Sequence, residues 1–235
     1  MVQRLFKMKK FAEWDITVDA TPQSLESRKL AAPELIHKEG DDKHLYANER
    51  LLKQMPVYSS DELSKKTVVL FYERRNEGLV ENVKRNLQQC QGQMGMKSGN
   101  ITTFMLPDVR QNWARMQEAV EKFFDDFKRK GGSKNPNDYF ALVLLNHQND
   151  YPDVKKVFSR LDILTQCIQS FTAKKMNLSV ASNIMKQVNS KVGGESLRMK
   201  MPEFMHKEKV MVIGIDVCHA GKKSVVGFCA TTNHQ

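Results

Sequence analysis

Five polar side chains in the second half of the sequence are spaced so that they could bind an anion. Tyr151 and Lys155 lie four residues apart at the start of an expected helix, and Gln187 and Lys191 repeat this spacing near the end of another. Residues four apart share one face of a helix, and the free N–H groups of a helix N-terminus favour negative charge. Gln166, on an expected strand between these helices, could present its amide to the same point. Spacing alone leaves open whether the three segments converge.

The charge of the chain also indicates an anionic partner. The net charge is +10, and residues 1–66 contribute almost nothing to it, because they hold 12 lysines and arginines against 11 acidic residues. Residues 67–235 hold the other 25 basic residues against 16 acidic ones. A basic excess confined to one region favours nucleic acid first and a membrane surface second.

Cysteine spacing and the N-terminus indicate a reducing, intracellular setting. The four cysteines include no C-x-x-C pair, which favours free thiols over a zinc site or disulfides. Cys218 and His219 are adjacent, so on a strand they would point to opposite faces and make poor joint ligands. No apolar run approaches the roughly 20 residues of a membrane span, and the N-terminus lacks the features of a signal peptide. We expect a cytoplasmic or nuclear protein with no membrane partner.

The elements that must position the candidate residues alternate between strands and helices from residue 67 onward. Apolar, β-rich runs predict strands, and apolar residues at helical spacing predict helices. The strands are expected at residues 67–72, 101–106, 139–145 and 163–168, and the helices at 77–89, 111–129, 151–160 and 177–191. This order predicts an α/β fold with a doubly wound, mainly parallel, Rossmann-like sheet. In such sheets ligands bind beyond the C-terminal ends of the strands.

The two ends of the sequence differ from this pattern. Residues 1–66 are expected to be an irregular linker region, with a short extended segment at residues 15–18. Near the C-terminus, residues 209–216 are expected to form a buried strand whose hairpin partner spans residues 224–232. We therefore expect three parts: a linker region over 1–66, a domain over 67–205 and a further hairpin segment over 206–235.

The ordered motifs resemble one known family. Tyr151-x-x-x-Lys155, the run Thr165-Gln166-Cys167, and a Gln-x-Asn-x-Lys-x-Gly-Gly run that ends at Gly194 resemble the MID domain of Argonaute and Piwi proteins. The resemblance implies that Tyr151, Lys155, Gln166 and Lys191 hold the 5′-phosphate of a single-stranded small guide RNA. It further implies a linker between PAZ and MID before this domain, and the opening β-hairpin of an RNase H-like PIWI domain after it.

Two further residues gain a role only through this resemblance. Gln187 stands where the Argonaute branch has a lysine, which resembles the Piwi branch, whose guides are piRNAs and whose phosphate site includes a divalent metal. Mg²⁺ near Gln187 is therefore the one expected cofactor. Asp216 matches the first carboxylate of the PIWI cleavage site, which binds two metals only when complete. Because the sequence supplies no partner carboxylate before Gln235, we expect this chain not to cleave RNA.

Other functions stay open at this point. The chain could be part of a slicer endonuclease whose remaining PIWI residues are not in this sequence, or a vestigial interaction fragment that keeps the fold without binding RNA. A cofactor enzyme of the Rossmann type is less favoured, because no G-x-G-x-x-G run follows the first strand. For the favoured function, in RNA-mediated gene silencing, we expect a monomer that meets target RNA only as part of a longer protein.

Overall fold

The computed structural model describes residues 13–15, 21–36, 44–46, 57–96, 101–107, 112–207, 209–220 and 223–231. The chain divides into two units, Met1–Ala31 and Ala32–Gln235. In the first unit the described residues are exposed, and Asp15 lies in a turn with a positive φ of 52°. The extended segment expected at residues 15–18 otherwise lies outside the described residues.

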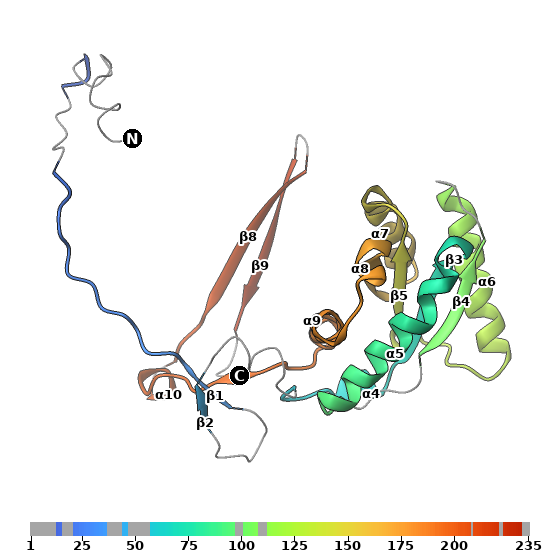
Figure 1. Cartoon of the computed structure of the whole chain (residues 1–235), viewed down its shortest axis with the longest axis horizontal. Helices are drawn as coiled ribbons and strands as arrows, with labels where there is room; N and C mark the ends of the chain where they lie inside the picture. The colour runs from blue at the N-terminus through green and yellow to red at the C-terminus, as the bar shows by residue number, and fades with distance from the viewer. Residues whose placement is uncertain are drawn as a thin grey trace. The chain divides into compact units, whose positions relative to one another are not determined.

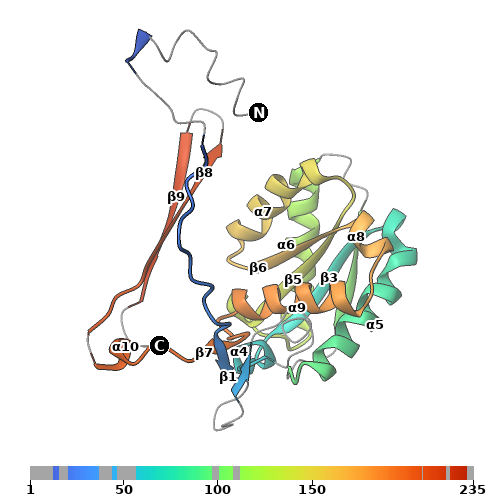
Figure 2. The same ribbon diagram turned by 60° about the vertical axis from the view of Figure 1, so that its left-hand side comes forward.

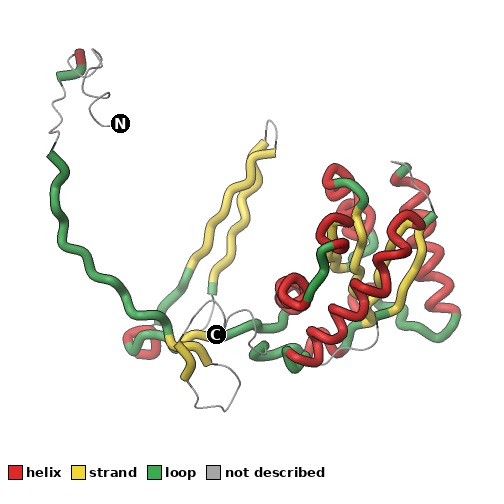
Figure 3. The backbone as a smooth tube through the Cα atoms, in the orientation of Figure 1, coloured by secondary structure: helices red, strands yellow, loops and turns green. Residues whose placement is uncertain are grey.

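The largest sheet of the second unit has four parallel strands (Figure 3). Its strands are β3 (Thr67–Glu73), β4 (Thr102–Leu106), β5 (Tyr139–Leu145) and β6 (Leu164–Gln169). They lie in the order β4-β3-β5-β6, and each neighbouring pair is parallel. All seven residues of β5 are buried, as expected for an apolar central strand. The predicted α/β class is therefore confirmed.

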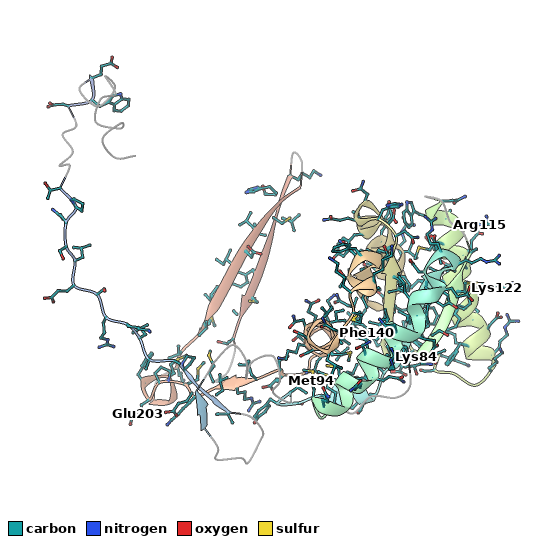
Figure 4. The ribbon with its side chains drawn as sticks, in the orientation of Figure 1. Lys84, Met94, Arg115, Lys122, Phe140 and Glu203 are labelled. Carbon is teal, nitrogen blue, oxygen red and sulfur yellow. The ribbon has the colours of Figure 1, made fainter. Side chains whose placement is uncertain are left out.

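Helices cover both faces of this sheet (Figures 1 and 2). The four long helices are α5 (Glu77–Gln93), α6 (Trp113–Arg129), α7 (Tyr151–Arg160) and α9 (Leu178–Lys191). Apolar residues of α5 and α9 pack on one face in one core cluster, and those of α6 and α7 pack on the other face in a second. Figure 4 shows Phe140 at the sheet, while Arg115 and Lys122 extend outward from α6. Among the described residues no helix is long and apolar enough to cross a membrane.

Several short elements have too few residues to show a sequence period, and the sequence did not predict them. The short helices are α4 (Asp61–Ser64), α8 (Ser170–Lys174) and α10 (Phe204–Lys207). The short strands form a small second sheet. This sheet has the antiparallel order β2-β1-β7, from strands β1 (Glu34–Ile36), β2 (His44–Tyr46) and β7 (Arg198–Met199). It pairs a segment expected to be irregular linker with residues that follow α9.

The predicted C-terminal hairpin forms, but its first strand runs over Ile213–Ala220 and not over residues 209–216, and the expected burial of that strand was wrong. Strand β8 (Ile213–Ala220) pairs antiparallel with β9 (Lys223–Ala230). The strand expected to be buried is exposed: Ile215 is 65% exposed and Val217 is 47% exposed, and Phe228 on the partner strand is 65% exposed. The physical reason is that an apolar strand is buried only when a second layer covers it, and no described segment packs on this hairpin as such a layer.

A close contact between α9 and the chain before α4 fixes the end of that helix. Asn189 is fully buried, and its Nδ2 donates a 2.8 Å hydrogen bond to the backbone oxygen of Ser59. The N–H of Gly194 returns to the Asn189 backbone oxygen at 2.8 Å, after Gly193 turns the chain with a φ of 89°. A Cβ atom at Gly194 would overlap the Asn189 side chain. Gly194 thus allows the chain to pass over a buried amide.

Substitution of Gly194 by Ala should destabilise the fold by roughly 2 kcal/mol, because the Asn189 side chain must move and lose its hydrogen bond. The matched control is Gly78→Ala in α5, where a Cβ meets no atom within 4 Å. That change should be neutral or stabilising, because alanine favours helix more than glycine does. Urea unfolding of both variants measures the difference, and equal stabilities would contradict this packing.

Candidate phosphate-binding site

The candidate residues come together at the open edge of the sheet. Strand β6 is an edge strand, and the two helices that flank it pack on opposite faces of the sheet. Side chains from α7 and α9 can therefore meet only beyond this edge. An edge strand also leaves backbone oxygens on its outer side without a partner strand. These oxygens can accept hydrogen bonds from the side chains of both helices.

Thr165 on β6 is where the two candidate lysines meet. The ammonium Nζ of Lys155, from α7, donates to the Thr165 backbone oxygen at 2.8 Å and to Thr165 Oγ1 at 2.6 Å. The Nζ of Lys191, the last residue of α9, donates to the same backbone oxygen at 2.9 Å. Two positive charges thus share one acceptor and lie within two hydrogen-bond lengths of each other.

The two candidate glutamines extend this group of side chains. Lys191 Nζ also donates to Gln166 Oε1 at 2.8 Å, and Gln166 Nε2 donates to Gln187 Oε1 at 3.0 Å. Gln166 is 9% exposed, so its amide is held in place by the strand and by these bonds. One hydrogen-bonded chain therefore links Lys155, Thr165, Lys191, Gln166 and Gln187, and the predicted residues lie together.

Tyr151 lies next to this chain of bonds. It is the first residue of α7 and is 47% exposed. Lys155 Nζ is 5.8 Å from the centroid of the Tyr151 ring, within the range of a cation–π contact. An exposed ring beside an ammonium group is suited to stack on a base whose phosphate the ammonium binds.

The electrostatics of the site favour an anion. Two ammonium groups this close repel each other by roughly 1 to 3 kcal/mol when they are partly exposed. Partial burial, and then the charge of Lys155, lower the pKa of Lys191. On the same strand, burial raises the pKa of the Cys167 thiol, and the two lysines only partly oppose this effect. Cys167 is therefore neutral near pH 7, and the site presents positive charge with no anion among these contacts to balance it.

A cavity of about 760 Å³ opens beside the lysines. It is lined by Pro136, Asn137, Lys155, Ser159, Asp162, Ile163, Leu164, Thr165 and Lys191. Its size is that of a small-molecule or nucleotide pocket. Asp162 is the one carboxylate among these lining residues and would repel an anion, so the lysine end of the cavity is the end suited to a phosphate.

The loop before Tyr151 is anchored to the neighbouring strand. Asn146 Nδ2 donates to Glu73 Oε2 at 2.7 Å, and Asn76 Nδ2 donates to Asn146 Oδ1 at 2.9 Å. Further along the loop, the His147 N–H donates to Asp150 Oδ2 at 3.1 Å. The start of α7 is thus held by polar contacts, which fixes where Tyr151 lies.

Two of these features were not predicted from the sequence. Thr165 acts mainly through its backbone oxygen, which leaves no signature in the residue type. The position of Glu73 at the end of an apolar strand is a weak indication of its anchoring role, because a carboxylate there is uncommon unless it is paired. Arg75 Nε lies 3.1 Å from Glu73 Oε2 and supplies that pairing.

Asp216 lies on strand β8 of the hairpin and is not among the hydrogen-bonded residues of this group. It stands opposite Gly227, and its Oδ1 accepts a 3.0 Å hydrogen bond from the Val217 N–H. Across the part of the chain that the structure describes, no three His, Cys, Asp or Glu side chains gather as a metal site would require. The predicted role of Asp216 as a first metal ligand stays a prediction.

Known proteins resemble the chain in sequence. A family model described as the Piwi domain matches residues 139–235. Piwi-like protein 1 of Gallus gallus is 23% identical over 97% of this chain and 25% of its own length. Protein argonaute 16 of Oryza sativa subsp. japonica is 24% identical over 92% of this chain and 25% of its own length. The chain thus spans about a quarter of the length of the curated relatives it matches.

Solved structures share the fold. The crystal structure of Drosophila Piwi aligns with a TM-score of 0.64 at 18% identity, over 86% of this chain and 30% of that chain. The Kluyveromyces polysporus Argonaute, solved with a guide RNA, aligns with a TM-score of 0.60 at 17% identity, over 88% of this chain and 26% of that chain. Residues 139–235 thus match the Piwi domain, the chain is similar in sequence to Piwi-like and argonaute proteins over most of its length, and it shares their fold.

Proposed function

We propose that this chain binds the 5′-phosphorylated end of a single-stranded small guide RNA, of the piRNA class that the Piwi-branch resemblance implies. The observation that carries the proposal is the pair of ammonium groups, Lys155 and Lys191, on one backbone oxygen of Thr165. An anion at this point relieves their repulsion. A related protein, the Argonaute of Kluyveromyces polysporus, was solved with a guide RNA, which supports the class of ligand.

The chemistry of a terminal phosphate matches this set of donors. Such a group carries about −1.5 to −2 charges near neutral pH and has three acceptor oxygens. Lys155 and Lys191 supply charge-assisted hydrogen bonds. Gln166 turns its Oε1 to Lys191 and its Nε2 to Gln187, so its amide must rotate to donate to a phosphate beside the lysines. The exposed ring of Tyr151 offers a face for the first base. A 5′-hydroxyl end lacks the charge that makes this arrangement favourable.

The residues present are compatible with Mg²⁺ only when the phosphate is also bound. Magnesium prefers hard oxygen ligands and commonly binds with substrate phosphates. Gln187 Oε1 is such an oxygen, but the two nearby ammonium groups would repel a dication on its own. We propose that Gln187 would be the protein ligand of an ion that enters with the RNA phosphate and adds charge compensation.

We propose binding and not cleavage as the role of this chain. Two-metal cleavage of RNA needs several carboxylates around the ions, and Asp216 is the one such residue that the family resemblance identifies. Target RNA, by this proposal, is met only as part of a longer protein. A monomeric state and an intracellular setting stay predictions.

The direct test compares two short RNAs that differ only in a 5′-phosphate or a 5′-hydroxyl. The phosphorylated RNA should bind the wild-type chain more tightly. Lys155→Ala and Lys191→Ala should each weaken its binding by about 10- to 100-fold, because each removes a charge-assisted hydrogen bond. Fluorescence anisotropy with labelled RNA measures these affinities, with and without magnesium.

The matched control for that test is Lys122→Ala, which removes a lysine that extends outward from α6 (Figure 4). It should change binding little, apart from a small loss shared by both RNAs. Gln187→Leu should reduce any gain that magnesium gives to the phosphorylated RNA. Equal binding of the two RNAs by the wild-type chain would refute the proposed function.

The pH dependence of binding should report the lowered pKa of Lys191. Phosphate favours the charged form of this lysine, so binding is strongest below its pKa and weakens as the pH rises through it. The loss should begin below about pH 10.4, the usual pKa of a lysine. Stability should not fall with Lys191 titration in this window, because a lowered lysine pKa means that the unfolded chain holds the proton more tightly.

The variant Lys191→Arg separates this effect from general alkaline changes. A guanidinium group stays protonated throughout the range, so the part of the pH dependence that Lys191 causes should disappear. Affinity measured in steps from about pH 7 to about pH 10 gives the profile. An identical alkaline decline in wild type and Lys191→Arg would show that Lys191 is not the titrating group.

A further inference from the structure

Two exposed aromatic rings stand out on the α/β domain. Among the described residues from 57 to 194, Tyr151 and Phe171 are the most exposed of the phenylalanine, tyrosine and tryptophan side chains, at 47% and 62%. Each lies in the first turn of a helix, α7 or α8, and each has a lysine four residues later. Lys155 Nζ is 5.8 Å from the Tyr151 ring centroid, and Lys175 Nζ is 4.0 Å from the Phe171 ring centroid.

The Phe171–Lys175 pair lies at the helix that follows strand β6, whereas the Tyr151–Lys155 pair lies on the helix that precedes this strand. Helix α8 directly follows β6, the strand that carries Thr165 and Gln166, as Figure 2 shows. Ser170 Oγ, at the start of α8, donates to the backbone oxygen of Asn146 at 3.4 Å. Asn146 opens the loop that leads to Tyr151, so this contact ties the start of α8 to the segment before α7.

The chemistry of the second pair suits a nucleotide. An apolar ring that is 62% exposed gains free energy when a flat group covers it, and every base has such a face. The ammonium of Lys175 lies over the ring, 4.0 Å from its centroid, and places a positive charge beside the exposed aromatic surface. Lys174 is exposed beside it and adds positive charge. Aromatic rings among basic groups are the usual means of binding single-stranded nucleic acid without reading its sequence.

We infer that Phe171 and Lys175 form a second nucleotide subsite, which takes a nucleotide of the guide after the first. The base stacks on the free part of the Phe171 ring, and the Lys175 ammonium faces the RNA backbone. The inference rests on the proposed function, because the phosphate at Lys155 and Lys191 fixes the strand that then reaches α8. It assigns to the short helix α8 a share in holding the guide.

The test uses two ligands: a nucleoside 5′-monophosphate and a 5′-phosphorylated RNA of about six nucleotides, a length within the range of known single-strand sites. Phe171→Ala should leave the affinity for the monophosphate unchanged and weaken binding of the longer RNA by about fivefold or more, as loss of one stacked base predicts. Lys191→Ala, in contrast, should weaken binding of both ligands.

A third ligand is a 5′-phosphorylated RNA that lacks the bases after its first nucleotide. The wild-type chain should lose affinity for this abasic RNA, while Phe171→Ala should bind it as well as wild type does. Phe171→Tyr should restore binding of the ordinary RNA, because it keeps the ring. Phe204→Ala removes another exposed ring, 56% exposed on α10, and should have no effect on either ligand.

The outcomes separate the two proposals. If the wild-type chain prefers phosphorylated ends but Phe171→Ala binds the longer RNA as tightly as wild type, the subsite is refuted and the proposed function stands. If the wild-type chain shows no preference for a 5′-phosphate, both fall. If Phe171→Ala weakens the abasic and ordinary RNAs equally, the ring does not stack on a base, and its exposed face is then better suited to a protein partner.

Discussion

The backbone oxygen of Thr165 is the point on which the candidate site depends. It accepts hydrogen bonds from Lys155 and Lys191 together, so two charges that repel each other are held on one atom. A carbonyl oxygen carries only a partial negative charge and cannot neutralise two ammonium groups. The arrangement is therefore favourable mainly when a stronger anion is present, and this gives the site its expected selectivity for phosphate.

The fold explains why the two lysines meet at this atom. Helices α7 and α9 lie on opposite faces of the sheet, and their side chains can approach each other only past the edge strand β6. The C-terminal end of α9 is fixed by the buried Asn189, which needs Gly194 to pass closely over it. At the other side, Asn146 and Glu73 fix the loop that begins α7. Packing distant from the ligand thus sets the positions of both charges.

Much of this fold could be predicted from the sequence, because long elements with a clear period were present. The apolar run of β5 and the amphipathic spacing of α6 identify a parallel sheet covered by helices. The contact between Lys155 and Lys191 could not be derived from spacing, because it depends on which strand lies at the edge. The family resemblance supplied that grouping, and the structure gives its physical basis.

Other features were beyond the sequence for different reasons. Strands of two or three residues, such as β1 and β7, are too short for a period and form through their partners. The apolar strand β8 looks buried in sequence, but burial depends on a covering layer and not on the strand itself. The sequence does not distinguish Phe171 from a core phenylalanine, because its exposure and its contact with Lys175 depend on the three-dimensional structure.

A crystal structure of this chain with a 5′-phosphorylated RNA tests the role of the two lysines most directly. We expect the terminal phosphate to lie within hydrogen-bonding distance of both Lys155 Nζ and Lys191 Nζ, with Gln166 beside it. A phosphate bound elsewhere, with both lysines still on Thr165 as in the free chain, would contradict this expectation.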